Sequence, residues 1–360
     1  MSPIHIQQLV EQVQRNCHIS DARHGSDYGL CTYLMKMREY FRWERGLGFS
    51  DSLGKDELGD WLTAREALWA SLESADFEPI RIDQVGYDPF AVDQINQALN
   101  PLGYVYSGGL GTSGRPHFFL GELKHLDKFS SEGVLVSGRE LARDLASPPA
   151  MNQGKLIFVR WESLRRILWE KLESWRWSRP DNALGRAFAC YDFENHLEES
   201  LDEMTNDELA LVLLHEQGER QAGELFGNAW NEMLLDLAFT PAELFARAVR
   251  DHLADCLVTL PVLEEMGRES SIHFYMGNLT GMRKELSSEM FTHYQHWRET
   301  GDASVFSEAA RRGRANWQSL AEKMLALHRE YGGDAAEPIN HLVKAWKQSG
   351  LPACASVGPG

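Results

Sequence analysis

LALVLLHEQGE, residues 209–219, places a histidine and two glutamates at the end of an almost wholly apolar run. An apolar run of this length faces a protein core, and burying an unpaired charged group costs several kcal/mol or more. The three polar side chains must therefore be paired, hydrogen-bonded or bound to a metal. This stretch predicts both a core helix and a candidate site on it.

Capping signals place that helix and a second one. Residues 205–208, TNDE, match the capping-box pattern, so we expect a helix over 206–226 that ends at Gly227. Residues 240–243, TPAE, repeat the pattern with a proline at the first helical position and predict a helix over 241–258. Further helices are expected at 162–175, 271–297 and 305–331.

Helical arithmetic then defines the faces of these two helices. Each residue advances about 100° around the axis, so His215 and Glu219 share one face within the apolar stripe, whereas Glu216 lies about 100° away. On the second helix, Asp251 and Asp255 lie on one side together with small residues that permit close packing. If that side meets the His215 face, one histidine and three carboxylates converge between the helices.

The residues His215-Glu216-x-x-Glu219 resemble the metal-binding helix of zincin peptidases over roughly ten positions, with Glu219 standing where the second histidine of HExxH belongs. The resemblance implies that His215 and Glu219 bind one divalent ion (zinc, iron or manganese) and that Glu216 is the general base. Asp251 or Asp255 is the expected third ligand. Additional candidates are His252, His273 and Arg247.

Two other interpretations remain open. The His/Glu/Asp cluster could be a buried polar network in a non-enzymatic interaction or structural protein, since His–Glu and Asp–Arg pairs at i, i+4 satisfy one another. A ferritin-like di-metal protein would also collect carboxylates and histidines from facing helices. That class uses Glu-x-x-His, which neither Glu208 nor Glu243 begins.

Composition limits the partners. The 360 residues carry 53 acidic and 36 basic side chains, a formal charge of −17, which disfavours nucleic acid and anionic membrane as partners. A small-molecule or peptide substrate, a second copy of the chain and a protein partner remain compatible with it. No nucleotide cofactor is expected, because the glycine-rich residues 108–116 lack the lysine of a phosphate loop.

The cysteines and the N-terminus indicate the compartment. Five cysteines at 17, 31, 190, 256 and 354 form no CxxC pair, and no signal-peptide or membrane-span pattern occurs. The sequence therefore predicts a cytoplasmic protein of bacterial type with reduced thiols.

The fold class expected from these patterns is α+β, mainly α. Residues 1–100 form an N-terminal helical region, 101–160 a small antiparallel sheet with a hairpin, 161–348 a helical bundle that carries the candidate site, and 349–360 a flexible tail. Within the sheet region the expected strands are 104–106, 117–120, 133–137 and 156–159, with a short helix at 139–145.

Overall fold

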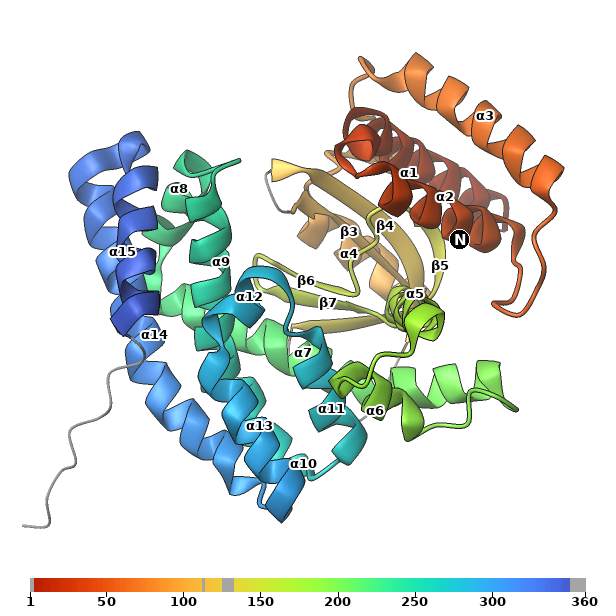
Figure 1. The fold of residues 1–360 in the computed structure, drawn as a ribbon. Helices are drawn as coiled ribbons and strands as arrows, with labels where there is room; N and C mark the ends of the chain where they lie inside the picture. Colours follow the sequence, from red (N-terminus) through yellow and green to blue (C-terminus); the bar gives the residue numbers. More distant parts are fainter. Residues whose placement is uncertain (1–2, 112–113, 125–132, 350–360) are drawn as a thin grey trace, which may run out of the picture. The chain divides into compact units, whose positions relative to one another are not determined.

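A computed structural model describes residues 3–111, 114–124 and 133–349 of the chain (Figure 1). The chain divides into two compact units. Unit 1 comprises residues 1–177 and 192–209, and unit 2 comprises residues 178–191 and 210–360. The tail predicted at 349–360 lies outside the described residues from position 350 onward.

Unit 1 combines helices with two sheets. Its helical elements are α1 (Pro3–His24), η1 (Gly25–Asp27), α2 (Leu30–Arg45), α3 (Lys55–Leu72), α4 (Val92–Leu99), η2 (Asn100–Leu102) and α5 (Trp161–Ser178). Its strands are β1 (Ile80–Ile82), β2 (Val85–Tyr87), β3 (Tyr104–Leu110), β4 (Pro116–Leu123), β5 (Val134–Arg143), β6 (Ala150–Gln153) and β7 (Leu156–Arg160).

The predicted small antiparallel sheet is wrong in extent and in topology. Five strands form one mixed sheet in the order β3-β4-β5-β7-β6, and β1 pairs with β2 in a second sheet within the region expected to be only helical. The β3–β4 hairpin is confirmed, with Tyr104 opposite Glu122. However, β5 and β7 run parallel, with Val134 opposite Ile157. A parallel pair needs a long crossover, which hairpin signals cannot predict.

The helix predicted at 139–145 is also wrong, because residues 134–143 form strand β5. The residues GRELAR favour a helix locally, but the strand pairs with β7 at its start and with β4 at its end. The Glu140 carboxylate receives two hydrogen bonds from Arg160, each of 2.8 Å, and both side chains are fully buried. Sheet pairing and this buried ion pair override local helix propensity.

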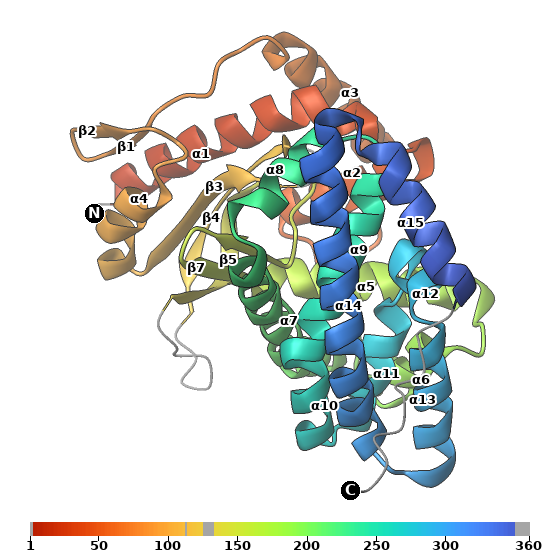
Figure 2. The same cartoon turned by 90° about the vertical axis from the view of Figure 1, so that its left-hand side faces the viewer.

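Helix α1 contributes part of the apolar core that covers the sheet. It packs against β4 and β5, and Figure 2 shows it running along β3 and β4. Leu9, Val13 and Cys17 of α1 share one core with Phe118 and Phe158 of the strands. A second core joins α2 and α3 and includes Met37, Tyr40, Phe41, Trp61 and Trp69.

The described elements of unit 2 are all helical. Its elements are α6 (Ala183–Ala189), the part of α7 (Leu197–Phe226) from Ala210 onward, α8 (Asn228–Asp236), α9 (Pro241–Ala254), the π-helical turn η5 (Asp255–Thr259), α10 (Leu260–Met266), α11 (Glu269–Asn278), α12 (Gly281–Leu286), α13 (Ser288–Thr300), α14 (Ser304–Tyr331), η6 (Gly332–Asp334) and α15 (Ala336–Ser349). Helix α14 packs beside α9 (Figures 1 and 2).

Several predicted helix ends needed correction. Thr205 does not begin α7, because its hydroxyl donates to the Leu201 carbonyl at 2.5 Å within a helix that already starts at Leu197. Gly227 ends that helix with φ of 62°, as expected. Thr240 caps α9, accepting a hydrogen bond from the Glu243 backbone N–H at 3.3 Å. The single helix expected at 271–297 is instead three helices, α11 to α13.

Pro261 explains the π-helical turn that follows α9. Proline has no N–H to donate to the carbonyl four residues before it, and its ring crowds that carbonyl. The helix is wider in the turn just before the proline, where the Leu260 N–H donates to the Asp255 carbonyl five residues back. The helix therefore continues from Pro241 to Met266 with Asp255 at the start of the wide turn.

Helices α7 and α9 approach each other closely at Gly218. A Cβ atom at this glycine would lie 2.4 Å from the Ala254 carbonyl oxygen, too near for any side chain. Gly218 precedes Glu219 and Ala254 precedes Asp255. The closest contact of the two helices thus lies directly beside the candidate site.

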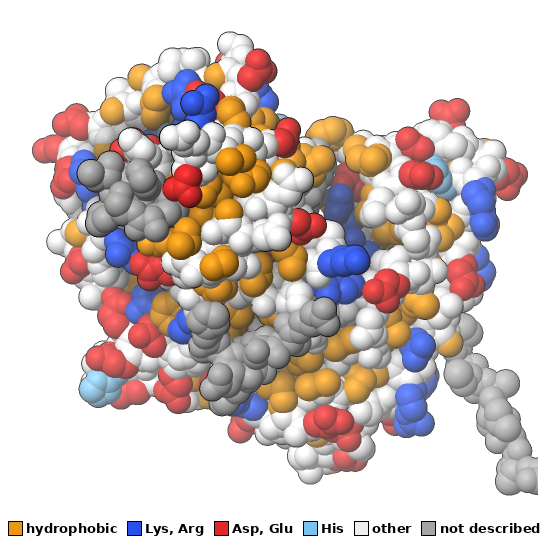
Figure 3. All heavy atoms as spheres, turned by 180° about the vertical axis from the view of Figure 1, so that it is seen from behind, with side chains coloured by type: hydrophobic (Ala, Val, Ile, Leu, Met, Phe, Trp, Pro, Cys, Tyr) orange, Lys and Arg blue, Asp and Glu red, His pale blue; other side chains and the backbone are white. Residues whose placement is uncertain are grey.

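Acidic side chains are spread over the surface. Figure 3 shows Asp and Glu interspersed with Lys and Arg across one face of the molecule. Among the helices that the structure describes, none combines the length and the apolar character needed to cross a bilayer.

We expect Gly218→Ala to destabilise unit 2 by about 1–3 kcal/mol, because the added methyl group forces α7 away from Ala254. The matched control is Gly223→Ala on the same helix, where a Cβ meets nothing within 4 Å. That change should stabilise by about 0.5–1 kcal/mol through helix propensity. Thermal melting of the two variants checks this, and equal melting temperatures would contradict the close approach.

Candidate functional site

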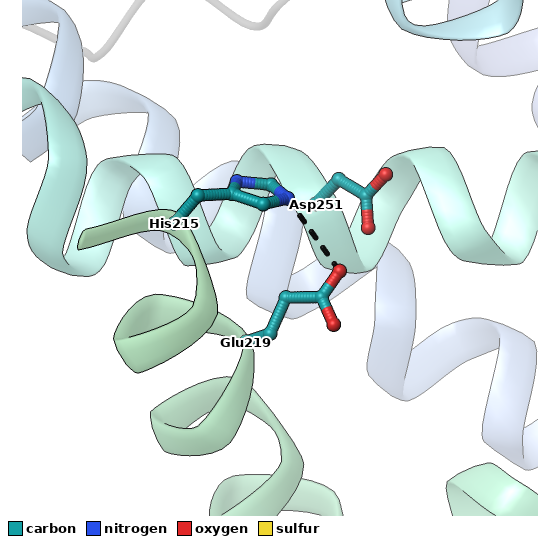
Figure 4. A group of neighbouring side chains, drawn as sticks. All are labelled: His215, Glu219 and Asp251. Carbon is teal, nitrogen blue, oxygen red and sulfur yellow. Dashed lines mark ion pairs between the residues drawn. The ribbon is translucent and has the colours of Figure 1, made fainter. Parts of the chain in front are cut away.

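His215, Glu219 and Asp251 form the core of the candidate site in unit 2. Each offers one ligand atom, and these atoms lie within 4.8 Å of one another. His215 and Glu219 project from α7 toward Asp251 on α9 (Figure 4). The distance from His215 Nε2 to Glu219 Oε1 is 3.5 Å. The predicted convergence of these three residues between two helices is present.

Asp255 lies beside this group but faces the other nitrogen of the histidine. Its Oδ1 is 2.8 Å from His215 Nδ1, and its Oδ2 accepts a hydrogen bond of 2.9 Å from the Tyr275 hydroxyl. Arg283 also donates to Oδ2. The Asp255 side chain is 1% exposed. Both carboxylate oxygens are therefore occupied, and the structure places Asp255 behind the histidine instead of among the converging atoms.

The charges around Asp255 favour its ionised form. Burial alone would oppose ionisation, but Arg283 and then His215 hold the pKa of Asp255 well below its ordinary value. Burial likewise disfavours a charged His215, yet the Asp255 carboxylate raises the pKa of this histidine well above its ordinary value. The hydrogen bond to Asp255 fixes the orientation of the imidazole and leaves Nε2 on the side of Glu219.

Arg250 is the cation closest to Glu219. Its Nη2 lies 2.8 Å from Glu219 Oε1 and 3.6 Å from Asp251 Oδ1. Burial would raise the pKa of Glu219, but Arg250 and His215 hold it well below its ordinary value. Arg250, which lies on the same helix as Asp251, thus neutralises the charge of Glu219.

The remaining two carboxylates are harder to ionise. Burial, and then repulsion from Glu219, raise the pKa of Glu216 to about 7 and that of Asp251 to about 6. Repulsion between Glu216 and Glu219 is expected because they lie three residues apart on α7, although Glu216 lies off its apolar face. The site therefore concentrates more carboxylates than its cations neutralise.

The structure places His252, His273 and Arg247 elsewhere. His252 Nε2 bonds to the Arg283 carbonyl oxygen at 2.9 Å, and its ring stacks on Trp317. Burial, and then Arg283, lower the pKa of His252 to about 4. His273 bonds to the Tyr294 hydroxyl at 2.7 Å. Arg247 pairs with Glu243 on its own helix. These three residues do not join the His215 group.

Sequence reasoning missed Arg250 and Arg283. Arg250 precedes Asp251, and its role could have been inferred because a carboxylate cluster needs a nearby cation. Tyr275 on α11 and Arg283 on α12 reach Asp255 only because these helices fold back onto α9. Their spacing in the sequence carries no signal of this contact.

Two family models match consecutive parts of the chain. The N-terminal domain model of a family of unknown function, DUF6866, matches residues 8–160, and its C-terminal domain model matches residues 165–345. The chain belongs to the DUF6866 family. No curated protein and no solved structure matches it. His215, Glu219 and Asp251 all lie within the residues that match the C-terminal DUF6866 domain.

We expect Asp255→Asn to lower the stability of unit 2 by about 3 kcal/mol, because it leaves Arg283 without its buried counter-charge. Asp251→Asn is the matched control. Neutralising Asp251 removes repulsion with Glu219, so its melting temperature should equal or exceed that of the wild type. Calorimetric melting in the presence of a chelator checks both variants. Equal melting of Asp255→Asn and wild type would refute the role given to Asp255.

Proposed function

We propose that unit 2 binds one divalent transition-metal ion through His215 Nε2, Glu219 and Asp251. One observation carries this proposal: three ligand atoms converge on one side of His215 while its other nitrogen bonds to a buried carboxylate. Metal-binding histidines are usually oriented in this way by a carboxylate or carbonyl on the far nitrogen. Asp255 would then act as the orienting group and not as a ligand.

The balance of charge supports an ion at this position. Without an ion, the raised pKa of His215 favours its protonated form, and this imidazolium joins Arg250 and Arg283 opposite the four carboxylates Glu216, Glu219, Asp251 and Asp255. A divalent ion at Nε2 would displace the His215 proton, and its two charges together with the two arginines would balance all four carboxylates in their ionised form. Buried like charges repel strongly, so an ion here would stabilise the folded unit.

The ligand set favours zinc, iron or manganese. One imidazole nitrogen and two carboxylate oxygens suit these borderline and harder ions, whereas thiolates would be expected at a copper(I) or structural zinc site. The side chains of His215, Glu219 and Asp251 are 25%, 18% and 20% exposed, so each is partly accessible to solvent. Three protein ligands with an open position characterise catalytic sites more than structural ones.

Metal-dependent hydrolysis of a small molecule or peptide is the activity that this arrangement supports best. A bound ion would supply Lewis-acid chemistry at a substrate oxygen. Glu216 would accept a proton from the attacking water, a role that suits a carboxylate whose pKa is about 7. Glu216 lies three residues before Glu219 on α7, so its carboxylate would reach the water from the side of Glu219, although helical arithmetic puts it about 100° from His215.

The competing interpretation is a structural network in a non-enzymatic protein. It is favoured by the ion pair of Arg250 with Glu219, since this arginine already satisfies one oxygen that the ion would use. The two proposals differ in what they require. The network needs no metal, whereas the metal site needs an ion that depends on His215.

We expect the wild-type protein, purified untagged and without chelators, to contain close to one equivalent of zinc, iron or manganese. His215→Ala should lose it, because the only nitrogen ligand is removed. His341→Ala is the matched control, since His341 and Glu337 form an exposed His–Glu pair at the same helical spacing. Elemental mass spectrometry measures the content. A folded wild type that holds no metal, and takes up none of the three when supplied, would exclude the site.

We expect Glu216→Gln to keep the metal and to lower the turnover of a hydrolysable substrate by about 10²–10⁴-fold, since general-base catalysis contributes this much. A panel of aryl esters, aryl phosphates and short peptides with metal-loaded protein provides the assay. Loss of metal together with activity in this variant would instead make Glu216 a ligand. Unchanged turnover would remove it from the mechanism.

A further inference from the structure

An apolar surface on unit 2 takes no part in the proposed metal site. Leu235 of α8, Phe239 in the turn after it, Leu244 of α9 and Tyr331 of α14 are 68%, 83%, 53% and 46% exposed. We call these four side chains the α8 face. All four belong to unit 2. Large apolar side chains that are exposed together on a surface mark a place where another molecule binds.

Tight turns bring Leu235, Phe239 and Leu244 together. The Ala238 N–H donates to the Leu235 carbonyl oxygen at 3.2 Å, which closes a turn directly before Phe239. Thr240 caps α9, so Phe239 precedes the cap and Leu244 follows it by four residues. Apolar side chains at these two positions face each other across the start of a helix.

Tyr331 reaches the same surface from α14. Helix α8 packs against α14 (Figure 2) and against η6. His328 Nε2 of α14 lies 2.8 Å from Oδ2 of Asp236, the last residue of α8. Tyr331 comes three residues after His328, one turn further on the same side of α14. The four apolar side chains therefore lie around the end of α8.

The backbone at Phe239 holds its side chain in solvent. Its φ is 64°, in the left-handed region that an aromatic residue rarely adopts. The Phe239 N–H donates to Glu243 Oε2 at 2.9 Å, which fixes the turn. Packing against Leu244 would cover Phe239, but its exposure of 83% shows that little of the ring is covered. This strained residue therefore contributes little to the packing of unit 2.

The surroundings of the α8 face are acidic. Residues 221–246, which include all of α8 and the start of α9, contain four acidic side chains and no lysine or arginine. Glu232 is exposed on α8, three residues before Leu235, and Asp334 of η6 is exposed as well. Arg329 lies two residues before Tyr331, but Glu330 beside it offsets its charge. These charges favour a basic partner.

A second copy of the chain fits this face poorly. In a two-fold contact the same surface meets itself, so Glu232 and Asp334 would lie opposite the carboxylates of the other copy. The formal charge of −17 on each chain adds to this repulsion. A partner that carries basic side chains around an apolar stripe would remove it.

We propose that the α8 face binds a basic amphipathic helix of a protein partner, whose apolar side covers Leu235 and Phe239 while its lysines or arginines face Glu232. A helix is favoured over an added β-strand, because the described elements of unit 2 are all helical and offer no strand edge to extend. The proposal does not depend on the metal site, since no residue of the α8 face is a proposed ligand.

Two matched peptides test the charge of the partner. One is a synthetic amphipathic helix of leucine and lysine, and the other is the same peptide with every lysine replaced by glutamate. Isothermal titration calorimetry of the full chain at physiological ionic strength measures both. We expect saturable binding of the lysine peptide with one peptide per chain, and at least tenfold weaker binding of the glutamate peptide. Absence of saturable binding by the lysine peptide, or equal affinity for the two, would overturn the proposal.

A variant of Phe239 tests the location. Phe239→Gly should weaken binding of the lysine peptide at least tenfold. Its melting temperature should not fall below that of the wild type, because glycine adopts a positive φ without strain. The matched control is Leu30→Ser, which removes a leucine of unit 1 that is 72% exposed and should leave the affinity unchanged. Wild-type affinity in folded Phe239→Gly would refute the location.

A charge reversal separates local attraction from net charge. Glu232→Lys should weaken binding of the lysine peptide at least fivefold, because it places a positive charge beside the α8 face. Glu299→Lys changes the net charge equally at an exposed position on α13 of the same unit and should have a clearly smaller effect. Equal weakening by the two variants would show that the peptide responds only to net charge, and would overturn the proposal.

Discussion

The buried carboxylate of Asp255 is the constraint on which unit 2 depends. A charge that is 1% exposed is stable only when each of its oxygens is satisfied, and His215, Tyr275 and Arg283 do this from three different helices. The positions of α7, α11 and α12 around α9 are thereby tied to one side chain. The hydrogen bond from His215 to Asp255 also orients the imidazole. One carboxylate therefore serves both the stability of unit 2 and the candidate metal site.

Two backbone features make that contact possible. Gly218 lets α7 approach the Ala254 carbonyl, and the wide turn forced by Pro261 begins at Asp255. Close approach brings Glu219 and Asp251 within reach of one ion, while the wide turn belongs to a class of helix distortion that is common at functional sites. Neither feature involves a catalytic side chain, yet both position the residues that would perform the chemistry.

Unit 1 also contains buried charged side chains, on strands β5 and β7 of its sheet. Glu140 and Arg160 neutralise each other inside the sheet, whereas Arg143 lies against the rings of Tyr40 and Trp43 with its Nε unpaired. The buried pair fixes one arrangement of strands, and the aromatic rings accommodate the charge of Arg143. The candidate metal site lies in the C-terminal DUF6866 domain.

The sequence by itself determined the local features: the capped start of α9, the end of α7 at Gly227, the β3–β4 hairpin and the placement of His215 and Glu219 on one helix face. These follow from interactions between residues close in the chain. Only the tertiary structure decided that residues 139–143 form a strand, that β5 and β7 run parallel, and that Asp255 orients the histidine while Asp251 joins the ligand group. The reason is physical, because those outcomes depend on partners such as Arg160, Tyr275 and Arg283, which lie about 20 or more residues away and leave no periodic signal.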